Sequence, residues 1–197
     1  MKKYLIILLF SIFPFLLIKD LPLMWVRYFF VTIFVIFLFY QTFTKYNFKQ
    51  LGYFKPTKQD YLFFLPMIPF SFLLLMLFIR FKLSYFCPPE PLTILEKIPT
   101  WLYLLIYALI NTPVQEVIYR PFLINHLEMV LKNKKLIFIL SVTLFSLLHL
   151  AWGAQLVLGS FFFGIYVVWW FMKTRNVVFI TIAHILIGLI IMYFCFI

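Results

Sequence analysis

Long uninterrupted apolar runs are the feature that most limits what this chain can fold into. A bilayer core about 30 Å thick is crossed by about 20 helical residues, and seven segments are apolar enough to serve. They lie at residues 4–18, 22–43, 61–79, 101–127, 136–152, 155–172 and 176–197. Within lipid the backbone must satisfy its own hydrogen bonds, which a helix does. The sequence therefore predicts an all-α, polytopic membrane protein with about seven transmembrane helices.

The composition excludes a soluble protein. Of the 197 residues, 65% are hydrophobic and 12% are charged, whereas soluble domains have about 45–50% and about 25%. This rules out a soluble enzyme, a disordered tail and a secreted disulfide scaffold. The length suits a single domain. Within it we expect residues 1–100 to form N-terminal transmembrane helices and a surface segment, and residues 101–197 to form the helices that carry the polar motifs.

The distribution of positive charge predicts the orientation. The net charge is +11, but the basic residues stand in short breaks between apolar runs, so we expect no nucleic-acid partner, which would need a solvated basic face. Eleven basic residues fall on one predicted side and five on the other. Because the more basic side faces the cytoplasm, we expect a cytoplasmic N-terminus and an outside C-terminus. The tryptophans agree with helix ends at the interface: Trp25, Trp101, Trp152, Trp169 and Trp170.

Two further segments and two cysteines complete this outline. Residues 44–60 mix basic and aromatic side chains and are predicted to lie on anionic headgroups at the inner surface. Residues 80–100 form the only sizeable outer loop. Cys87 and Cys195 show no metal-ligand spacing. We interpret them as a free loop thiol and a lipid-facing residue, with a bridge between them as the alternative.

Ionisable side chains at membrane depth mark the candidate site, because each costs about 2.5–3.5 kcal/mol to insert. The fourth span carries Gln115, Glu116 and Arg120, the fifth ends at His149, and the seventh carries His184. Glu116 and Arg120 are four residues apart and share one face of a helix. We expect the acid, the guanidinium and the two imidazoles to meet in one polar pocket.

Such a pocket has a chemical use and several alternatives. A carboxylate can take a proton from water, one imidazole can hold that water or protonate the leaving amine, and the other can stabilise an oxyanion. Arg120 can fix the carboxylate rotamer. Alternatively, the Glu–Arg pair is structural, each histidine bridges two helices, or the acid and imidazoles form a proton relay in a transporter.

Neighbouring residues of the fourth span carry further expectations. Pro113 and Pro121 flank the Glu–Arg pair and each removes a backbone donor, so they are expected to bend the helix and open a cavity. Asn125, His126 and Glu128 are interpreted as a solvated helix end without chemistry. Tyr119 and Asn111 are expected to line the pocket at most.

Three motifs in order carry a family resemblance. They are Gln115-Glu116-Val-Ile-Tyr-Arg120, Phe145 to His149, and His184 to Gly188. The chain resembles the CPBP family (CAAX proteases and bacteriocin-processing enzymes), which includes type II CAAX prenyl endopeptidases and shows EExxxR, FxxxH and HxxxN or HxxxD. The resemblance covers about residues 100–197. It implies an intramembrane endopeptidase that cuts a membrane-associated or C-terminal segment, prenylated or not, with the lipid bilayer and a peptide or protein substrate as partners.

Two positions depart from the family pattern. Gln115 stands where the first glutamate is expected, and Gly188 stands where a polar oxyanion donor is expected. Either Glu116 serves as the base, or the chain is an inactive relative that binds a partner, as in self-immunity against a bacteriocin. The resemblance demands no cofactor, although Glu116, His149 and His184 have the chemistry of zinc ligands. A small transporter stays the third interpretation.

Overall fold

The structure, a computed structural model, describes residues 40, 44, 47, 49–81, 99–150 and 153–196, without the side chains of residues 195 and 196. Within these ranges the regular elements are helices and no strand occurs, which confirms the all-α prediction. The first two predicted spans lie almost wholly outside the described residues. So do Cys87, Trp25, Trp152, the side chain of Cys195 and most of the outer loop, and the count of seven spans stays a prediction.

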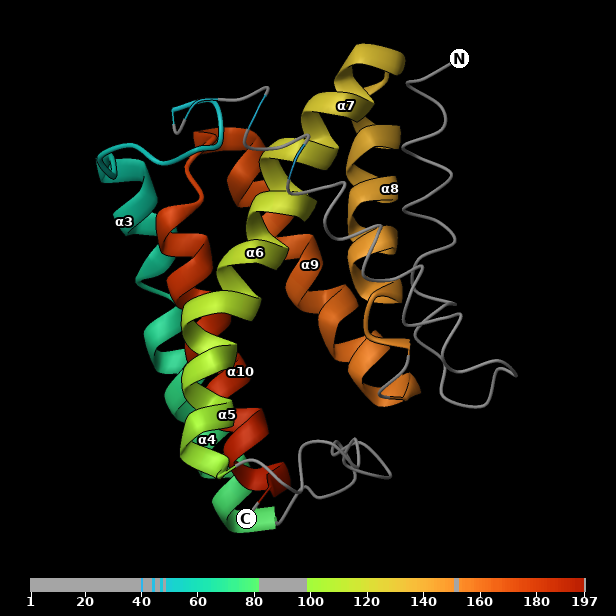
Figure 1. Cartoon of the computed structure of the whole chain (residues 1–197). Coiled ribbons are helices and arrows are strands. Elements are labelled where there is room, and N and C mark those ends of the chain that lie inside the picture. Colours follow the sequence, from blue (N-terminus) through green and yellow to red (C-terminus); the bar gives the residue numbers. More distant parts are fainter. Residues whose placement is uncertain are drawn as a thin grey trace.

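The described elements form five helical rods (Figure 1). The first is α3 (Lys58–Phe64) followed by α4 (Met67–Phe81), and the second is α5 (Thr100–Ile106), η3 (Tyr107–Asn111), α6 (Thr112–Val117), η4 (Ile118–Phe122) and α7 (Leu123–Val130). The others are α8 (Lys134–Leu147), α9 (Ala154–Thr174) and α10 (Val178–Phe196). Lys58–Phe81, Thr100–Val130 and Ala154–Thr174 are long and apolar enough to cross a membrane. These helix lengths fit an integral membrane protein.

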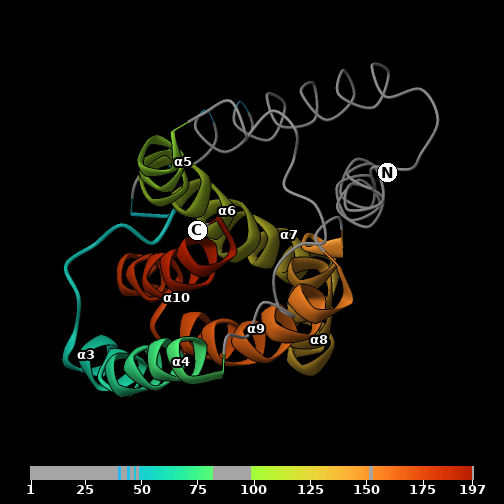
Figure 2. The ribbon, with the colours of Figure 1, turned by 90° about the horizontal axis from the view of Figure 1, so that it is seen from below.

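The helix α10 occupies the middle of the described part. Seen from below, it lies between the rod of α5 and α6 on one side and α3 and α4 on the other (Figure 2), and it contacts all of these and α9. The buried core includes Phe122 of η4, Phe145 of α8, Trp170 of α9 and Ile180 of α10. A side chain of α10 that points toward α6 is therefore enclosed by protein.

The second rod changes its winding on both sides of α6. The π-helical turns η3 and η4 precede and follow it, and Pro113 comes just after the first while Pro121 lies inside the second. Proline lacks an N–H and clashes with the preceding turn of an α-helix, and a wider turn accommodates it. The helix is irregular at both prolines, and the cavity that the sequence predicted there stays a prediction. Single π-helical turns are frequent at functional sites.

The segment before α3 is attached to the turn between α9 and α10. Gly52 accepts a hydrogen bond from the Val177 N–H at 3.0 Å, and its φ of 79° belongs to the left-handed region. A Cβ at Gly52 would lie 2.8 Å from the Arg175 carbonyl oxygen. Leu51 is buried and Lys55 is exposed. The segment is thus partly enclosed by protein, where the sequence had predicted a segment spread over headgroups.

Asp60 joins this segment to α9 and α10. Its carboxylate accepts hydrogen bonds from the Thr57 hydroxyl at 2.8 Å, from Trp170 Nε1 at 3.3 Å and from Asn176 Nδ2 at 3.3 Å. We call Thr57, Asp60, Trp170 and Asn176 the Asp60 network. Trp170 lies near the end of α9 and is fully buried, so its ring packs within the protein. Trp101 and Trp169 are exposed, as expected of interfacial rings.

The C-terminal end of α7 also differs from its prediction as a solvated helix end. Glu128 forms a two-point ion pair with Arg175, and Asn125 accepts a third hydrogen bond from the same guanidinium. His126 is buried and its Nδ1 contacts the Phe122 carbonyl oxygen at 2.8 Å. Arg175 caps α9 in the left-handed conformation, with φ 57°. This contact holds the α9–α10 turn against α7.

Candidate active site

Glu116 and Arg120 form a buried ion pair on the second rod. Glu116 lies in α6 and Arg120 one turn later in η4, and Arg120 Nε lies 2.9 Å from Glu116 Oε2. Arg120 Nη2 also donates to Glu116 Oε1 at 3.3 Å. Both side chains are 0% exposed. The spacing predicted this pair, and the structure brings the two charges together away from solvent.

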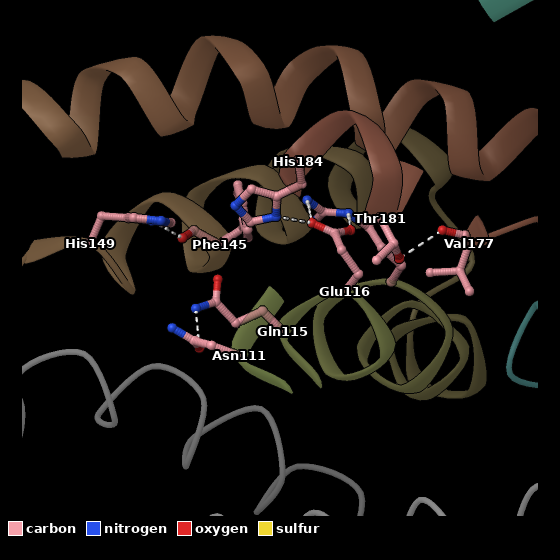
Figure 3. A network of polar contacts seen from close by, with 9 residues as sticks. Asn111, Gln115, Glu116, Phe145, His149, Val177, Thr181 and His184 are labelled. Carbon is pink, nitrogen blue, oxygen red and sulfur yellow. Dashed lines mark hydrogen bonds and ion pairs between the residues drawn. The ribbon is translucent and has the colours of Figure 1, made fainter. Parts of the chain in front are cut away.

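His184 reaches the same carboxylate from the central helix. Its Nδ1 lies 2.7 Å from Glu116 Oε1, as Figure 3 shows. An ionised carboxylate can only accept hydrogen bonds, so Nδ1 carries the hydrogen and Nε2 of a neutral ring is left with its lone pair. In Figure 3 that second nitrogen faces the side of the site where His149 and Gln115 lie. Glu116 thus fixes both the tautomer and the orientation of His184.

Phe145 is the aromatic side chain around which the site is packed. The Arg120 guanidinium carbon lies 4.2 Å from the centre of its ring, at a distance typical of a cation–π contact. Its ring centre lies 5.7 Å from that of His184 and 5.2 Å from that of His149. One phenyl ring of α8 therefore contacts the guanidinium and both imidazoles.

His149 lies next to Phe145, just beyond the end of α8. Its Nδ1 donates to the Phe145 carbonyl oxygen at 3.2 Å, which leaves Nε2 as the nitrogen able to accept a proton. It interacts electrostatically with His184, Arg120 and Glu116. The structure therefore brings Glu116 and His184 into direct contact, and it places His149 against the same Phe145 ring that packs on His184.

Gln115 points away from the ion pair. Its Nε2 donates to Asn111 Oδ1 at 2.8 Å, at the exposed side of the rod. Its Oε1 is buried and has no hydrogen-bond partner among the described residues. Successive helical residues are turned by about 100°, which explains why Glu116 and Gln115 face different surroundings. Gln115 therefore lies beside the Glu116–His184 pair and does not belong to it.

Tyr107 fills the space beside Gly188, and the motifs did not point to it. A Cβ built on Gly188 would lie 1.8 Å from the Tyr107 hydroxyl oxygen and 2.5 Å from Cζ. Gly188 is one turn after His184, and the rings of Tyr107 and His184 meet edge to face at 6.4 Å. Glycine at this position was the available signal, because a missing side chain in a packed core leaves a volume that another residue fills.

Tyr53 brings the segment before α3 close to the same acid. Burial raises the pKa of the Tyr53 phenol above its ordinary value, and the negative charge of Glu116 adds to the rise. The segment was predicted only as a membrane-surface element. The hydrogen bond between Gly52 and Val177 attaches this segment to the α9–α10 turn. Tyr53 can therefore approach the site although it precedes α3.

The residues of the site do not fit a zinc centre. Glu116 Oε1 is occupied by His184 Nδ1 and Oε2 by Arg120, whose positive charge opposes a second cation. Among the described residues no three His, Cys, Asp or Glu side chains gather as metal ligands.

Comparison with known families agrees with the three motifs. Residues 97–190 match the family described as Rce1-like, type II CAAX prenyl endopeptidase. This segment is just under half of the chain and contains every candidate site residue. No curated protein and no solved structure matches the chain. Over residues 97–190, the chain is therefore similar to the Rce1-like family of type II CAAX prenyl endopeptidases, in agreement with the CPBP resemblance that the three motifs carry.

Proposed function

We propose that this protein is an intramembrane endopeptidase that hydrolyses a peptide bond of a membrane-associated substrate with water activated by Glu116 and His184. The observation that carries the proposal is the buried 2.7 Å contact between Glu116 Oε1 and His184 Nδ1, which joins the candidate span Thr100–Val130 to the shorter apolar helix α10. An ionisable pair inside a membrane protein is expensive and is usually retained for function.

In the proposed hydrolysis, the contact between Glu116 and His184 assigns a role to each residue. His184 Nε2 accepts a proton from water while the water oxygen bonds to the scissile carbonyl carbon, and the carbonyl oxygen becomes negatively charged. Glu116 remains ionised and stabilises the imidazolium through Nδ1, as an acid behind a catalytic histidine does. The carbon–nitrogen bond then breaks, the oxyanion reforms a carbonyl, and the leaving amine takes up a proton. A carboxylic acid and an amine are the products.

The remaining site residues support this step. Arg120 holds Glu116 through Oε2, which keeps the carboxylate in its rotamer and neutralises it in the resting state. His149 supplies the second imidazole, which can hold the water or give the proton to the amine. Gln115, on the neighbouring side, offers an amide that can hydrogen-bond a peptide backbone.

Cleavage of a farnesylated peptide with a C-terminal CAAX sequence, by purified protein in liposomes, tests the proposal. Glu116→Gln and His184→Ala should each lower kcat by about 100-fold or more, as expected for loss of a general base. Because the two act as a unit, the double variant should be no slower than the slower single variant. Glu128→Gln is the matched control, since this acid of the same rod pairs with Arg175, and it should retain activity. If Glu116→Gln cleaved the peptide at the wild-type rate, the catalytic role assigned to Glu116 would be wrong.

A second function, non-catalytic binding of a membrane peptide, is favoured by one specific observation. Both oxygens of Glu116 are already engaged, and position 115, where the family motif has its first acid, carries an amide. The variant Gln115→Glu separates the two functions. If wild-type protein binds the farnesylated peptide without cutting it and only Gln115→Glu cuts it, the natural chain is a binding protein.

A further inference from the structure

Tyr107 is the polar side chain of η3 that lies closest to the α10 face bearing His184. It is 5% exposed, and its hydroxyl oxygen lies within the space that a side chain at Gly188 would occupy. Residues 184 and 188 are one helical turn apart and share a face. The phenol is thus directed at α10 one turn beyond the imidazole that activates water in the proposed function.

The surroundings leave this hydroxyl able to change partners. The Thr112 hydroxyl interacts with it, yet Thr112 Oγ1 has no well-aligned hydrogen bond among the described residues. The Thr112 N–H donates to the Tyr107 carbonyl across the π-helical turn, so the backbone that carries the ring is fixed. A phenol on a fixed backbone, with its hydroxyl directed at α10, is suited to donate a hydrogen bond to a group bound there.

An open apolar groove lies along neighbouring faces of the helices that carry Tyr107 and Gly188. Its lining comes from α4, the start of the second rod and the end of α10: Leu75, Trp101, Leu104, Leu105, Ala108, Leu189, Ile190, Tyr193 and Phe194. Ala108 and Leu189 adjoin Tyr107 and Gly188 in the chain. A substrate segment bound in the groove would lie beside the helical turns that carry Tyr107 and Gly188.

We infer that the Tyr107 hydroxyl donates a hydrogen bond to the scissile carbonyl oxygen as negative charge develops on it, beside the water held by His184. Gly188 serves this arrangement by leaving the space into which the phenol projects. The inference rests on the proposed function, because an oxyanion forms only if a carbonyl is attacked. It assigns Tyr107 a role in the transition state and no role in the protonation of Glu116 or His184.

The variant Tyr107→Phe removes the donor and keeps the ring. With the farnesylated CAAX peptide, kcat should fall by about 100- to 1,000-fold with little change in KM, as for loss of one oxyanion donor. Tyr103→Phe is the matched control: its hydroxyl, one turn away, contacts Met192 Sδ at 3.8 Å, and the variant should cleave at the wild-type rate.

A binding measurement makes the result independent of turnover. The same peptide with a hydrated trifluoromethyl ketone at the scissile carbonyl presents the tetrahedral oxygens, and Tyr107→Phe should bind it at least 10-fold more weakly than wild type. If Glu116→Gln and His184→Ala abolish cleavage while Tyr107→Phe cleaves and binds like wild type, the inference is overturned and the proposed function stands. If wild type neither cleaves the peptide nor binds the ketone, the proposed function fails and the inference falls with it.

Discussion

At the level of single residues, the burial of Glu116 determines what each neighbour must do. A carboxylate removed from water needs an opposite charge and hydrogen bonds to offset lost hydration. Arg120 supplies the charge at 2.9 Å and His184 a hydrogen bond at 2.7 Å. The same two contacts fix the rotamer of the acid and the tautomer of the imidazole. These two contacts therefore both stabilise the buried carboxylate and orient it for the proposed reaction.

Removal of Arg120 tests how far Glu116 depends on it. Arg120→Met leaves the carboxylate buried without its cation and should lower the free energy of unfolding by about 3–5 kcal/mol, as for other buried pairs that lose one partner. Denaturant unfolding in detergent micelles measures this. Arg175→Met breaks a partly exposed pair with Glu128, with side chains 41% and 31% exposed, and should change stability by about 0–1 kcal/mol.

The double variant Glu116→Gln with Arg120→Met sharpens the same test. Once the carboxylate is neutral, loss of the guanidinium should be much less harmful, so the double variant should be more stable than the sum of the single effects predicts. Additive effects would mean that Arg120 stabilises the protein through its packing on Phe145 and not through Glu116.

At the level of elements, the contact between α8 and α9 sets the position of Phe145. Gly164 of α9 faces this ring, and a Cβ there would lie 3.2 Å from Phe145 Cδ1. Phe145 in turn packs on Arg120, His149 and His184. A small residue in α9 therefore controls the placement of side chains contributed by three other parts of the chain.

Two glycines of α9 provide a matched pair for this relation. Gly159→Ala adds a methyl group to open space and should stabilise the helix by up to about 1 kcal/mol. Gly164→Ala pushes on Phe145 and should be less stable than Gly159→Ala by about 1–3 kcal/mol, the usual effect of overpacking. Thermal unfolding compares the two variants, and peptide cleavage should fall only in Gly164→Ala. If both variants had the same unfolding temperature and the same cleavage rate, Phe145 would accommodate the added methyl group without any change in stability or activity.

Helix boundaries followed from the sequence, whereas helix rotations did not. Apolar length predicted spans at 101–127 and 155–172, and the structure has Thr100–Val130 and Ala154–Thr174. The i, i+4 spacing predicted the contact of Glu116 with Arg120. No comparable rule joins Glu116 to His184, because α10 is apolar around most of its circumference and offers no polar stripe to orient it. The Tyr107–Gly188 contact joins residues far apart in sequence and could only come from the folded structure.

At the level of the whole molecule, polar contacts hold the segment before α3 against the turn between α9 and α10. Gly52 pairs with Val177 through the backbone, and the Asp60 network joins α3 to α9 and to the turn before α10. Asn176 Nδ2 also donates to the Phe54 carbonyl at 3.2 Å. Apolar packing in lipid is weakly directional, since the tails are as apolar as the side chains. These hydrogen bonds therefore specify how α10, which carries His184, is set against the first rod.

Asp60→Ala tests this arrangement at the scale of the fold. The variant removes the helix cap that Thr57 and Asp60 share and leaves Trp170 Nε1 without its acceptor, so the free energy of unfolding should fall by about 2–4 kcal/mol. Gln59→Ala, one residue earlier and exposed, is the control and should change stability by less than about 0.5 kcal/mol. Because Asp60 and Trp170 share one bond, Asp60→Ala with Trp170→Phe should lose less stability than the two single variants together. Strictly additive losses, or a stable Asp60→Ala protein with full activity, would show that the segment before α3 and α10 hold their places independently of this network.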